Sequence, residues 1–352
     1  MKRIISLFLS LTCLLGLLLV SACDNSSKCK NCSFGEQTVY KEVDGVVKVG
    51  KLCEVCGFID AERTIEVDYV AQNSNEVSTF QTQAEKKGGS CSIVLKAGEY
   101  ENVYLINRMK GSTYLVFETG VQVVNVNVYA DADNVTLENA HFYSDPETGK
   151  GGGVSFGTSG VVSAEGERNY MRVTIKNCSF YGNTNIARNW AAGMVEDLIV
   201  ENCSFTNSVN ATKSVFTPIF IAEVGGNTII RNCTFDGAEY GMIRFGHYYN
   251  RGVTGTLLIE NNIFKNSMDE RAACIMIHAQ NGLVVDVVNN TFIDDAPCFF
   301  TYKRQDENYP DSPFVADPST ITYNVGANKW QTIPESIANA TYYNVSDQQQ
   351  ID

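Results

Sequence analysis

The sequence predicts an all-β fold, a single-stranded solenoid in which short strands stack as the coils of a parallel β-helix. The first observation is a four-residue motif that recurs along the chain, three times clearly and three times in diverged form. The second is its spacing, because the motif asparagines follow one another at steps of 38, 25, 30, 29 and 28 residues, with an insertion in the first copy. Alternating apolar residues precede the clear copies, as strands require. The copies are Asn139-Ala140-His141-Phe142, Asn177-Cys178-Ser179-Phe180, Asn202-Cys203-Ser204-Phe205, Asn232-Cys233-Thr234-Phe235, Asn261-Asn262-Ile263-Phe264 and Asn289-Asn290-Thr291-Phe292.

The N-terminal segment predicts export and a lipid anchor. Lys2 and Arg3 precede an apolar stretch at residues 4–20, which is too short and too interrupted by Ser and Thr for a membrane span and is typical of a signal peptide. The ending Leu19-Val20-Ser21-Ala22-Cys23 resembles a bacterial lipoprotein signal, which implies cleavage after residues 1–22 and lipid on Cys23. Residues 23–28 then form a tether, and we expect an extracytoplasmic protein held at a bacterial membrane by acyl chains. The alternative is an ordinary cleaved signal with an incidental cysteine.

Composition and charge limit the partners. With 352 residues, of which 44% are hydrophobic and 11% aromatic, the chain can build a sizeable core and is not expected to be disordered. A formal net charge of −13 argues against nucleic acid as a partner, because a phosphate backbone requires a basic surface. An acidic polymer would have to meet a local basic patch or bound cations, and we expect the protein to be a monomer.

Residues 29–60 predict a small cysteine-rich segment before the solenoid. Cys29 and Cys32 form one C-x2-C pair, Cys53 and Cys56 form another, and Asp44-Gly45 between two strand-like runs signals a β-hairpin. This arrangement resembles a zinc ribbon, which implies that the four thiolates hold one structural Zn²⁺. Export to an oxidising compartment leaves two disulfides as the alternative. Either way the role is structural, because a four-cysteine site has no open coordination position.

The unit from Asn202 to Asn232 predicts three short strands separated by turns, which describe one coil of a parallel β-helix. Asparagine suits the corner because it tolerates the left-handed backbone region, and we expect the stacked asparagine amides to form a ladder. Two further rows of side chains are expected to stack in the core. They are Cys178, Cys203 and Cys233, and Phe142, Phe180, Phe205, Phe235, Phe264 and Phe292.

These repeats resemble the right-handed parallel β-helix family, the pectate-lyase-like superfamily, whose repeats read apolar-x-apolar-x-Asn-Asn/Cys-x-Phe. The resemblance is firm over residues 134–293, weaker over 92–133 and weakest beyond 309, and we assign the β-helix with its caps to residues 65–345. Residues 93–95 with the cysteine segment, and residues 321–343 with Trp330, are the expected caps. A leucine-rich repeat is the alternative, but its L-x-x-L-x-L spacing is missing.

The resemblance implies that a polysaccharide lies along the first-strand sheet, and it supports a uronate lyase hypothesis. The predicted strands are residues 161–165, 190–195, 218–224, 241–248, 273–280 and 298–304. Lys303 or His278 is the candidate base, and Arg244 the candidate carboxylate clamp or acid. Glu165 and Glu223 are candidate ligands of a cation such as Ca²⁺. The candidate substrate-binding residues are Trp190, Arg188, His247, Tyr248 and Arg304.

The chain also departs from the known enzymes of this family, so other functions stay open. It lacks the clustered Asp residues of cation-dependent pectate lyases, and Gly246-His247-Tyr248 only partly matches the Gly-His-Gly of polygalacturonases. Elimination is favoured over hydrolysis because no carboxylate pair stands out as acid and base. A non-catalytic glycan-binding protein could use Trp190, Tyr248, Tyr249 or Trp330 as platforms for sugar rings. A surface-structural or adhesion protein without a sugar ligand is a further alternative.

Overall fold

A computed structural model of the chain describes two compact units, Met1–Val67 and Asp68–Asp352, which we treat separately. The residues that the structure describes are 31–105, 111–129, 134–145, 151–157, 170–188, 194–208, 217–221, 223–224, 226–238, 241–245, 252–253, 255–267, 274–277, 282–293, 300–301, 322–331, 343–346 and 349–350.

The N-terminal unit is a three-stranded antiparallel sheet in the order β1 (Phe34–Val43), β2 (Val46–Cys53) and β3 (Ile59–Glu66). Asp44 and Gly45 join β1 to β2 with φ values of 53° and 80°. Positive φ at both central residues is the requirement of a type I′ turn, and it confirms the hairpin that Asp-Gly predicts. Only a few apolar side chains are buried in this sheet, chiefly Tyr40, Val47, Val49, Ile59 and Ile65.

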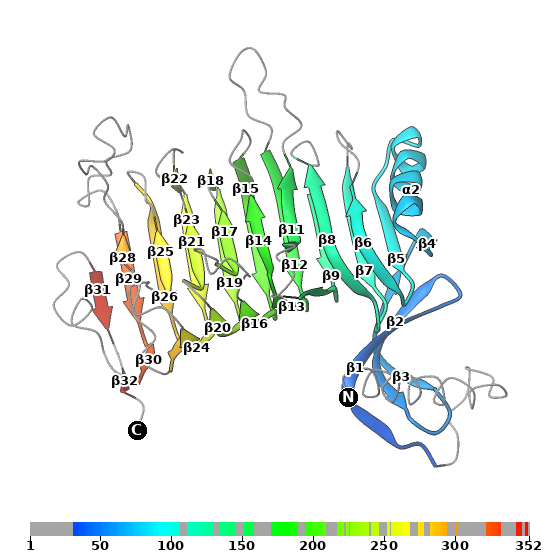
Figure 1. Ribbon diagram of the computed structural model, residues 1–352, viewed down its shortest axis with the longest axis horizontal. Coiled ribbons are helices and arrows are strands. Elements are labelled where there is room, and N and C mark those ends of the chain that lie inside the picture. Colours follow the sequence, from blue (N-terminus) through cyan, green and yellow to red (C-terminus); the bar gives the residue numbers. More distant parts are fainter. Residues whose placement is uncertain are drawn as a thin grey trace. The chain divides into compact units, whose positions relative to one another are not determined.

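The second unit is a parallel β-helix whose coils contribute up to three strands each, as predicted (Figure 1). The first-strand and third-strand faces, which we call sheets, join through β8 into one 16-stranded sheet, and the second-strand sheet has 13 strands. The first-strand sheet contains β6 (Glu99–Tyr104), the end of β8 (Gln122–Tyr129), β11 (Gly152–Gly157), β14 (Thr184–Arg188), β17 (Ile219–Ile221), β21 (Ile243–Phe245), β25 (Ile275–Ile277) and β28 (Phe300–Thr301). The second-strand sheet contains β4 (Tyr69–Ala71), β5 (Cys91–Leu95), β7 (Ser112–Phe117), β9 (Asn134–Glu138), β12 (Tyr170–Lys176), β15 (Met194–Glu201), β18 (Glu223–Val224), β19 (Asn227–Arg231), β22 (Gly252–Val253), β23 (Thr256–Glu260), β26 (Val284–Val288), β29 (Thr322–Gly326) and β31 (Tyr343–Ser346). The third-strand sheet contains the start of β8, β10 (His141–Ser144), β13 (Ser179–Gly182), β16 (Ser204–Ser208), β20 (Thr234–Ala238), β24 (Ile263–Ser267), β27 (Thr291–Phe292), β30 (Lys329–Trp330) and β32 (Gln349–Gln350).

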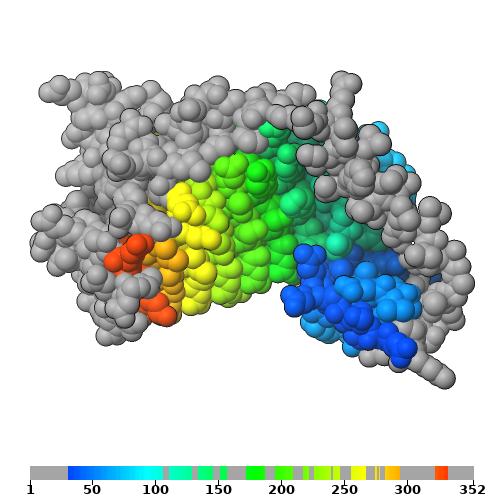
Figure 2. Space-filling model, turned by 60° about the horizontal axis from the view of Figure 1, so that its bottom comes forward, coloured from blue at the N-terminus to red at the C-terminus, as the bar shows by residue number. Residues whose placement is uncertain are grey.

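Pairing between coils is parallel and in register at the motif, so equivalent residues lie side by side. Phe180 pairs with Phe142 on one side and with Phe205 on the other. Since each coil contacts mainly its two neighbours, the coils appear in Figure 2 as parallel rows of atoms from green through yellow. The outward side chains of one sheet therefore form straight lines along the solenoid.

The motif asparagines adopt the predicted left-handed backbone. Their φ values lie between 53° and 64°, at Asn139, Asn177, Asn202, Asn232, Asn261 and Asn289. The expected amide ladder, however, is formed by the next residue of the later coils. Asn262 Nδ2 donates to Asn290 Oδ1 at 3.0 Å, and Asn290 Nδ2 donates to Asn328 Oδ1 at 3.1 Å. The first asparagine serves the turn, and its side chain lies at the outer edge of the corner, where Asn261 and Asn289 are exposed.

Both predicted core rows are confirmed. Successive phenylalanine rings from Phe142 to Phe292 stack at centroid distances of 4.6 to 4.9 Å, and Trp330 extends the row at 4.0 Å from Phe292. Cys178, Cys203 and Cys233 are buried and occupy equivalent inward positions. Burial, followed by the two neighbouring thiols, raises the pKa of Cys203 well above its usual value. Cys203 is therefore a poor nucleophile, and all three buried side chains pack as small apolar groups.

The ends of the solenoid differ from the prediction. Residues 93–95 are part of β5, which pairs with β4 and β7, and residues 322–330 contribute β29 and β30, which are also paired on both sides. These segments are regular coils, so their assignment as caps was wrong. A helix that the sequence reasoning missed, α2 (Ser74–Lys86), packs against the early strands β4, β5 and β6. Within the part of the chain that the structure describes, no helix is long and apolar enough to cross a membrane.

Candidate functional site

One line of aligned positions follows the first-strand sheet along the solenoid. Pairing between neighbouring strands aligns Tyr104, Asn127, Ser155, Ala187, Phe220, Arg244, Met276 and Phe300. In β17 and β21 the flanking residues Ile219, Ile221, Ile243 and Phe245 are buried, so the middle residue of each strand faces away from the core. We call this line the first-sheet row.

Arg244 and Phe220 are neighbours in the first-sheet row. The guanidinium carbon of Arg244 lies 5.0 Å from the centroid of the Phe220 ring, and both side chains are partly exposed. Stacking on the ring orients the guanidinium, which leaves a planar cation beside an apolar surface. Such a pair can accept a carboxylate and the apolar face of a sugar ring together.

Arg244 is the residue nominated for glycan chemistry whose side chain the structure describes. The nominated residues that lie outside the described residues are Glu165, Trp190, His247, Tyr248, His278, Lys303 and Arg304. Two others have a described backbone only. Arg188 ends β14 in the first-strand sheet, whereas Glu223 begins β18, which pairs with β15 and β22 in the second-strand sheet.

Four of the six predicted first strands are confirmed, and the other two lie wholly or largely outside the described residues. Residues 218–224, 241–248, 273–280 and 298–304 contain β17, β21, β25 and β28. Residues 161–165 and 190–193 lie outside the described residues, and residues 194–195 belong to β15 of the second-strand sheet. In this part of the chain the first-strand sheet contains β11 (Gly152–Gly157) and β14 (Thr184–Arg188). The alternation of Val154 and Phe156 was the signal for β11, and the preceding glycines made it resemble a loop.

The second-strand sheet carries basic groups that are occupied by carboxylates. Its strands align a row of alternating charge, namely Glu138, Lys176, Glu201, Arg231 and Glu260. Lys176 Nζ lies 3.1 Å from Glu138 Oε2, and Arg231 Nη2 lies 2.6 Å from Glu201 Oε2. Arg172 likewise pairs with Asp197 at 3.2 Å. These cations neutralise the sheet itself and leave little positive charge for an acidic ligand.

Sequence reasoning missed a polar group of side chains at the N-terminal end of the first-strand sheet. Ser155 Oγ donates to Asn125 Oδ1 at 3.0 Å, and Asn125 Nδ2 lies 3.5 Å from Asn102 Oδ1. Asn127 and Tyr104 are aligned in the first-sheet row, and 49% of Tyr104 is exposed. The alternation of asparagine with valine in β8 was the available signal.

A second missed feature is an exposed aromatic pair on the third-strand sheet. Tyr143 and Tyr181 are 44% and 36% exposed, and their rings stack at 5.5 Å with an interplanar angle of 5°. The ring faces are turned towards each other, so the pair offers solvent mainly its edges and hydroxyl groups. It is a less suitable platform for a sugar ring than an open ring face.

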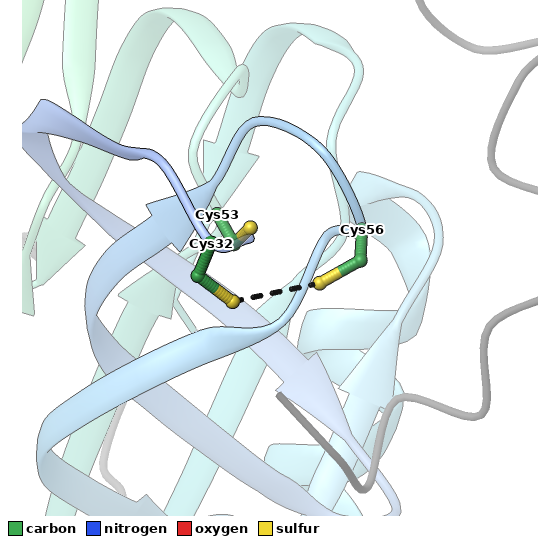
Figure 3. Close-up of side chains that lie close together, drawn as sticks. All are labelled: Cys32, Cys53 and Cys56. Atoms are coloured by element: carbon green, nitrogen blue, oxygen red, sulfur yellow. Dashed lines mark hydrogen bonds between the residues drawn. The ribbon is translucent and has the colours of Figure 1, made fainter. Parts of the chain in front are cut away.

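In the N-terminal unit, three of the four predicted cysteine ligands come together (Figure 3). Cys32 precedes β1, Cys53 ends β2 and Cys56 lies in the following turn, and their Sγ atoms all lie within 4.8 Å of one another. The Sγ atoms of Cys32 and Cys56 are 3.9 Å apart, far beyond the length of a disulfide bond, about 2.05 Å. Zinc–sulfur bonds of about 2.3 Å in a tetrahedron place sulfur atoms roughly 3.8 Å apart, so the cluster could hold a metal ion. Cys29 lies outside the described residues.

The turn around Cys53 is arranged to stabilise a thiolate. Gly57 N donates to the Cys53 carbonyl at 2.8 Å, and Gly57 has a φ of 72°, which favours glycine. Burial raises the pKa of Cys53, but the Cys56 amide, the Cys32 thiol, the Val55 amide and the Cys56 thiol outweigh it and lower this pKa to about 6. Thiolate is the form that binds metal.

Comparison with known proteins identifies the central coils. Residues 119–292 match the family model described as "Right handed beta helix region". A search of curated proteins and a search of solved structures each returned no match. The family match and the parallel sheets together confirm the predicted fold class, a right-handed parallel β-helix preceded by a small β-hairpin sheet.

Proposed function

We propose that this protein is a lipid-anchored, extracytoplasmic β-helix that binds an acidic polysaccharide along its first-strand sheet. The observation that carries the proposal is the Arg244 guanidinium over the Phe220 ring, in an outward row that follows the solenoid. A polymer needs an extended surface, and the stacked coils supply one.

Electrostatics supports an acidic ligand at this sheet. The chain has a formal net charge of −13, so an anionic polymer requires a local cation to offset general repulsion. On the first-strand sheet the Arg244 guanidinium, over the Phe220 ring, supplies such a cation. Guanidinium groups bind carboxylates through two parallel hydrogen bonds, which suits a uronic acid.

The binding experiment uses the soluble protein without its signal and lipid. Retention on gels of polygalacturonate, hyaluronan and neutral xylan is compared for wild type, Arg244→Ala and the matched control Arg172→Ala. We expect the acidic gels to retain the wild type and Arg172→Ala, and Arg244→Ala to lose about tenfold in affinity. Equal retention of both variants, or retention by xylan alone, would show that Arg244 is not the binding cation.

Cleavage is a further part of the proposal, and it would be β-elimination. Arg244 would neutralise the uronate carboxylate, Lys303 or His278 would remove the C5 proton, and Glu165 and Glu223 would hold a cation such as Ca²⁺. The bond from C4 to the glycosidic oxygen would break as the C4–C5 double bond forms, and the leaving oxygen would take up a proton. Ultraviolet absorbance at the wavelength of unsaturated uronates measures the product. An increase in absorbance that is lost in both Arg244→Ala and Lys303→Ala supports a lyase. Binding without product supports a non-catalytic glycan-binding protein. If the protein shows neither binding nor product, the remaining candidate is a surface-structural or adhesion protein.

The proposed anchor is a lipid on Cys23, and it is tested by labelling cells with a radioactive fatty acid. The wild type should carry label and sediment with membranes. Cys23→Ser should lose the label and be released, and label retained in this variant would exclude the anchor at this residue.

We also propose that Cys32, Cys53 and Cys56, with Cys29, bind one structural zinc ion. The distances between the sulfur atoms and the lowered pKa of Cys53 support this assignment over disulfides. Elemental analysis should find one zinc per chain, which Cys32→Ser loses and Cys91→Ala retains. Protein without zinc but with four fewer titratable thiols would indicate disulfides instead.

A further inference from the structure

We infer that the N-terminal end of the first-strand sheet is a second glycan subsite, which binds uncharged sugar units of the same polymer. The inference rests on the proposed function, because it assigns a distinct part of the ligand to β6, β8 and β11. It concerns residues that no sequence pattern nominated.

The described side chains of two outward lines at this end are neutral and able to donate and accept hydrogen bonds. One outward line contains Tyr104, Asn127 and Ser155, and the line beside it contains Asn102 and Asn125. Each asparagine amide has two donors and an acceptor, and each hydroxyl has one donor and two lone pairs. Sugar hydroxyl groups also donate and accept, so amides and hydroxyls on a flat surface match them without a charge.

Asn127 has an incomplete set of hydrogen bonds. Its Nδ2 atom is shielded from solvent and has no partner among the residues that the structure describes. The neighbouring Asn125 is occupied, since its Oδ1 accepts from Ser155 at 3.0 Å. Donors that are buried and unpaired are rare in folded proteins, and rotation of this side chain towards solvent would bring the donor within reach of an oxygen atom of a ligand. Tyr104, which pairs with Asn127 in register and is 49% exposed, lies where a sugar ring could pack beside that oxygen.

Charge separates the two subsites. Among the described residues, Glu101 is exposed in β6 directly before Asn102, so a uronate carboxylate would be repelled at this end and attracted at Arg244. Asn127 and Arg244 are four strand steps apart along the sheet, through β11, β14 and β17, which corresponds to roughly 19 Å at about 4.8 Å per step. A polymer with acidic and neutral units can therefore occupy both subsites, and the second contact forms within the complex.

The test uses two probes at two lengths. Hyaluronan oligosaccharides alternate uronate and neutral units, oligogalacturonates contain uronates only, and each is used as a disaccharide and as an octasaccharide. The wild type should bind the hyaluronan octasaccharide about five- to tenfold more tightly than the disaccharide, since it adds the second subsite. Asn127→Ala and Tyr104→Ala should lose this advantage and bind the disaccharide as the wild type does. Arg244→Ala should weaken both lengths.

Matched variants and thermal midpoints complete the test. Asn227→Ala in the second-strand sheet and Tyr143→Ala in the third-strand sheet should keep the advantage, and all variants should melt within a few degrees of the wild type. Unchanged octasaccharide binding in Asn127→Ala and Tyr104→Ala would overturn the second subsite while the Arg244 site stands. If the oligogalacturonate octasaccharide also binds more tightly than its disaccharide, by the same factor and in a way that depends on Asn127, the second subsite does not prefer uncharged units. Failure of the wild type to bind any of the four probes would overturn the proposed function, and the inference with it.

Discussion

At the corner between β26 and β27, two adjacent asparagines have different physical roles. Asn289 is exposed and has a φ of 56°, so its backbone conformation is what the turn requires. Asn290 is fully buried, and its Nδ2 donates to the Ile259 carbonyl at 2.9 Å and to Asn328 Oδ1 at 3.1 Å. The first residue can be replaced by glycine, whereas the second holds three consecutive coils together.

Replacing these two residues should separate the roles. Asn290→Ala should lower the free energy of unfolding by roughly 2–4 kcal/mol, because it leaves the buried polar groups of its neighbours unpaired. Asn289→Gly should change it by no more than about 0.5 kcal/mol, since glycine accepts a positive φ without strain. Guanidinium denaturation monitored by circular dichroism measures both, and similar losses in the two variants would contradict the assignment.

Asp236 on the third-strand sheet should make stability depend on pH in the acid range. Hydrogen bonds from Asn266 and Lys265 lower the pKa of this carboxyl below its usual 3.8, although partial burial opposes them. Because the folded-state pKa lies below the unfolded one, the stabilisation is complete above about pH 4 and is lost as the pH falls through the folded value. Asp236→Asn should therefore reduce the dependence of the melting temperature on pH between pH 5 and pH 2. Asp286→Asn in the second-strand sheet serves as the comparison. A slope as steep as that of the wild type would exclude this contribution.

Single positions could be predicted where local chemistry decides them. Asparagine at the corner predicts a positive φ because few other residues adopt it readily. The ladder at Asn262, Asn290 and Asn328 could not be separated from the row of cysteines in earlier coils, since both sets occupy the same inward place. Asn127 was also missed, because only pairing with β6 and β11 brings it beside Tyr104 and Ser155.

Among the elements, α2 is the one that the sequence reasoning lacked. Its buried residues Val77, Gln81 and Ala84 lie on one face, but the polar Gln81 obscures the apolar periodicity. Gln81 is satisfied inside the protein, where Nε2 donates to Thr113 Oγ1 at 3.0 Å. The better signal was the N-terminal cap, in which Asn73 Oδ1 accepts from the Glu76 amide and Glu76 Oε2 accepts from the Gln72 amide.

Removing this cap should destabilise the end of the solenoid. Asn73→Ala should cost about 1 kcal/mol, because the Glu76 amide loses its acceptor at the helix N-terminus. Thr79→Ala on the exposed side of α2 is the matched control and should have little effect, since alanine has the higher helix propensity. Hydrogen exchange of the α2 and β5 amides measures the change, and equal protection in both variants would rule out a stabilising cap.

Short strands explain why the first-strand sheet was predicted less well than the rest. β17, β21 and β25 contain three residues each, so alternation has too few positions to fix the strand in a sequence. The second-strand sheet has longer strands that end at a motif asparagine, and their register follows from it. The residues proposed to bind a ligand therefore lie in the part of each coil with the weakest sequence signal.

For the molecule as a whole, the repeat predicted the fold because each coil imposes the same demands on its neighbours. The phenylalanine row and the corner asparagines are set by period alone, without any knowledge of distant contacts. The N-terminal unit is stabilised differently, because its sheet buries few apolar side chains. A small fold of this kind commonly needs a metal or a disulfide.

Chelation should therefore separate the two units. With a strong zinc chelator, amides of β1, β2 and β3 should lose protection from hydrogen exchange, while amides of β13, β16 and β20 keep theirs, because the metal supplies folding free energy only where it binds. In Cys32→Ser, the amides of β1, β2 and β3 should already lack protection from hydrogen exchange before chelator is added. Loss of protection in both units together, or in neither, would contradict a structural metal confined to the N-terminal unit.

The constant register of the coils has a consequence for how this protein can change over generations. Asn202 and Asn232 occupy equivalent corners, and the strands that follow them, β16 and β20, pair in register. A deletion of residues 203–232 would join Asn202 directly to Cys233, so each remaining strand would meet a partner of its own sheet. A tandem duplication of the same segment would insert one coil with equal ease. The length of the outer surface can thus change by one whole coil at a time, while the stacked interior rows keep the same residues in each coil.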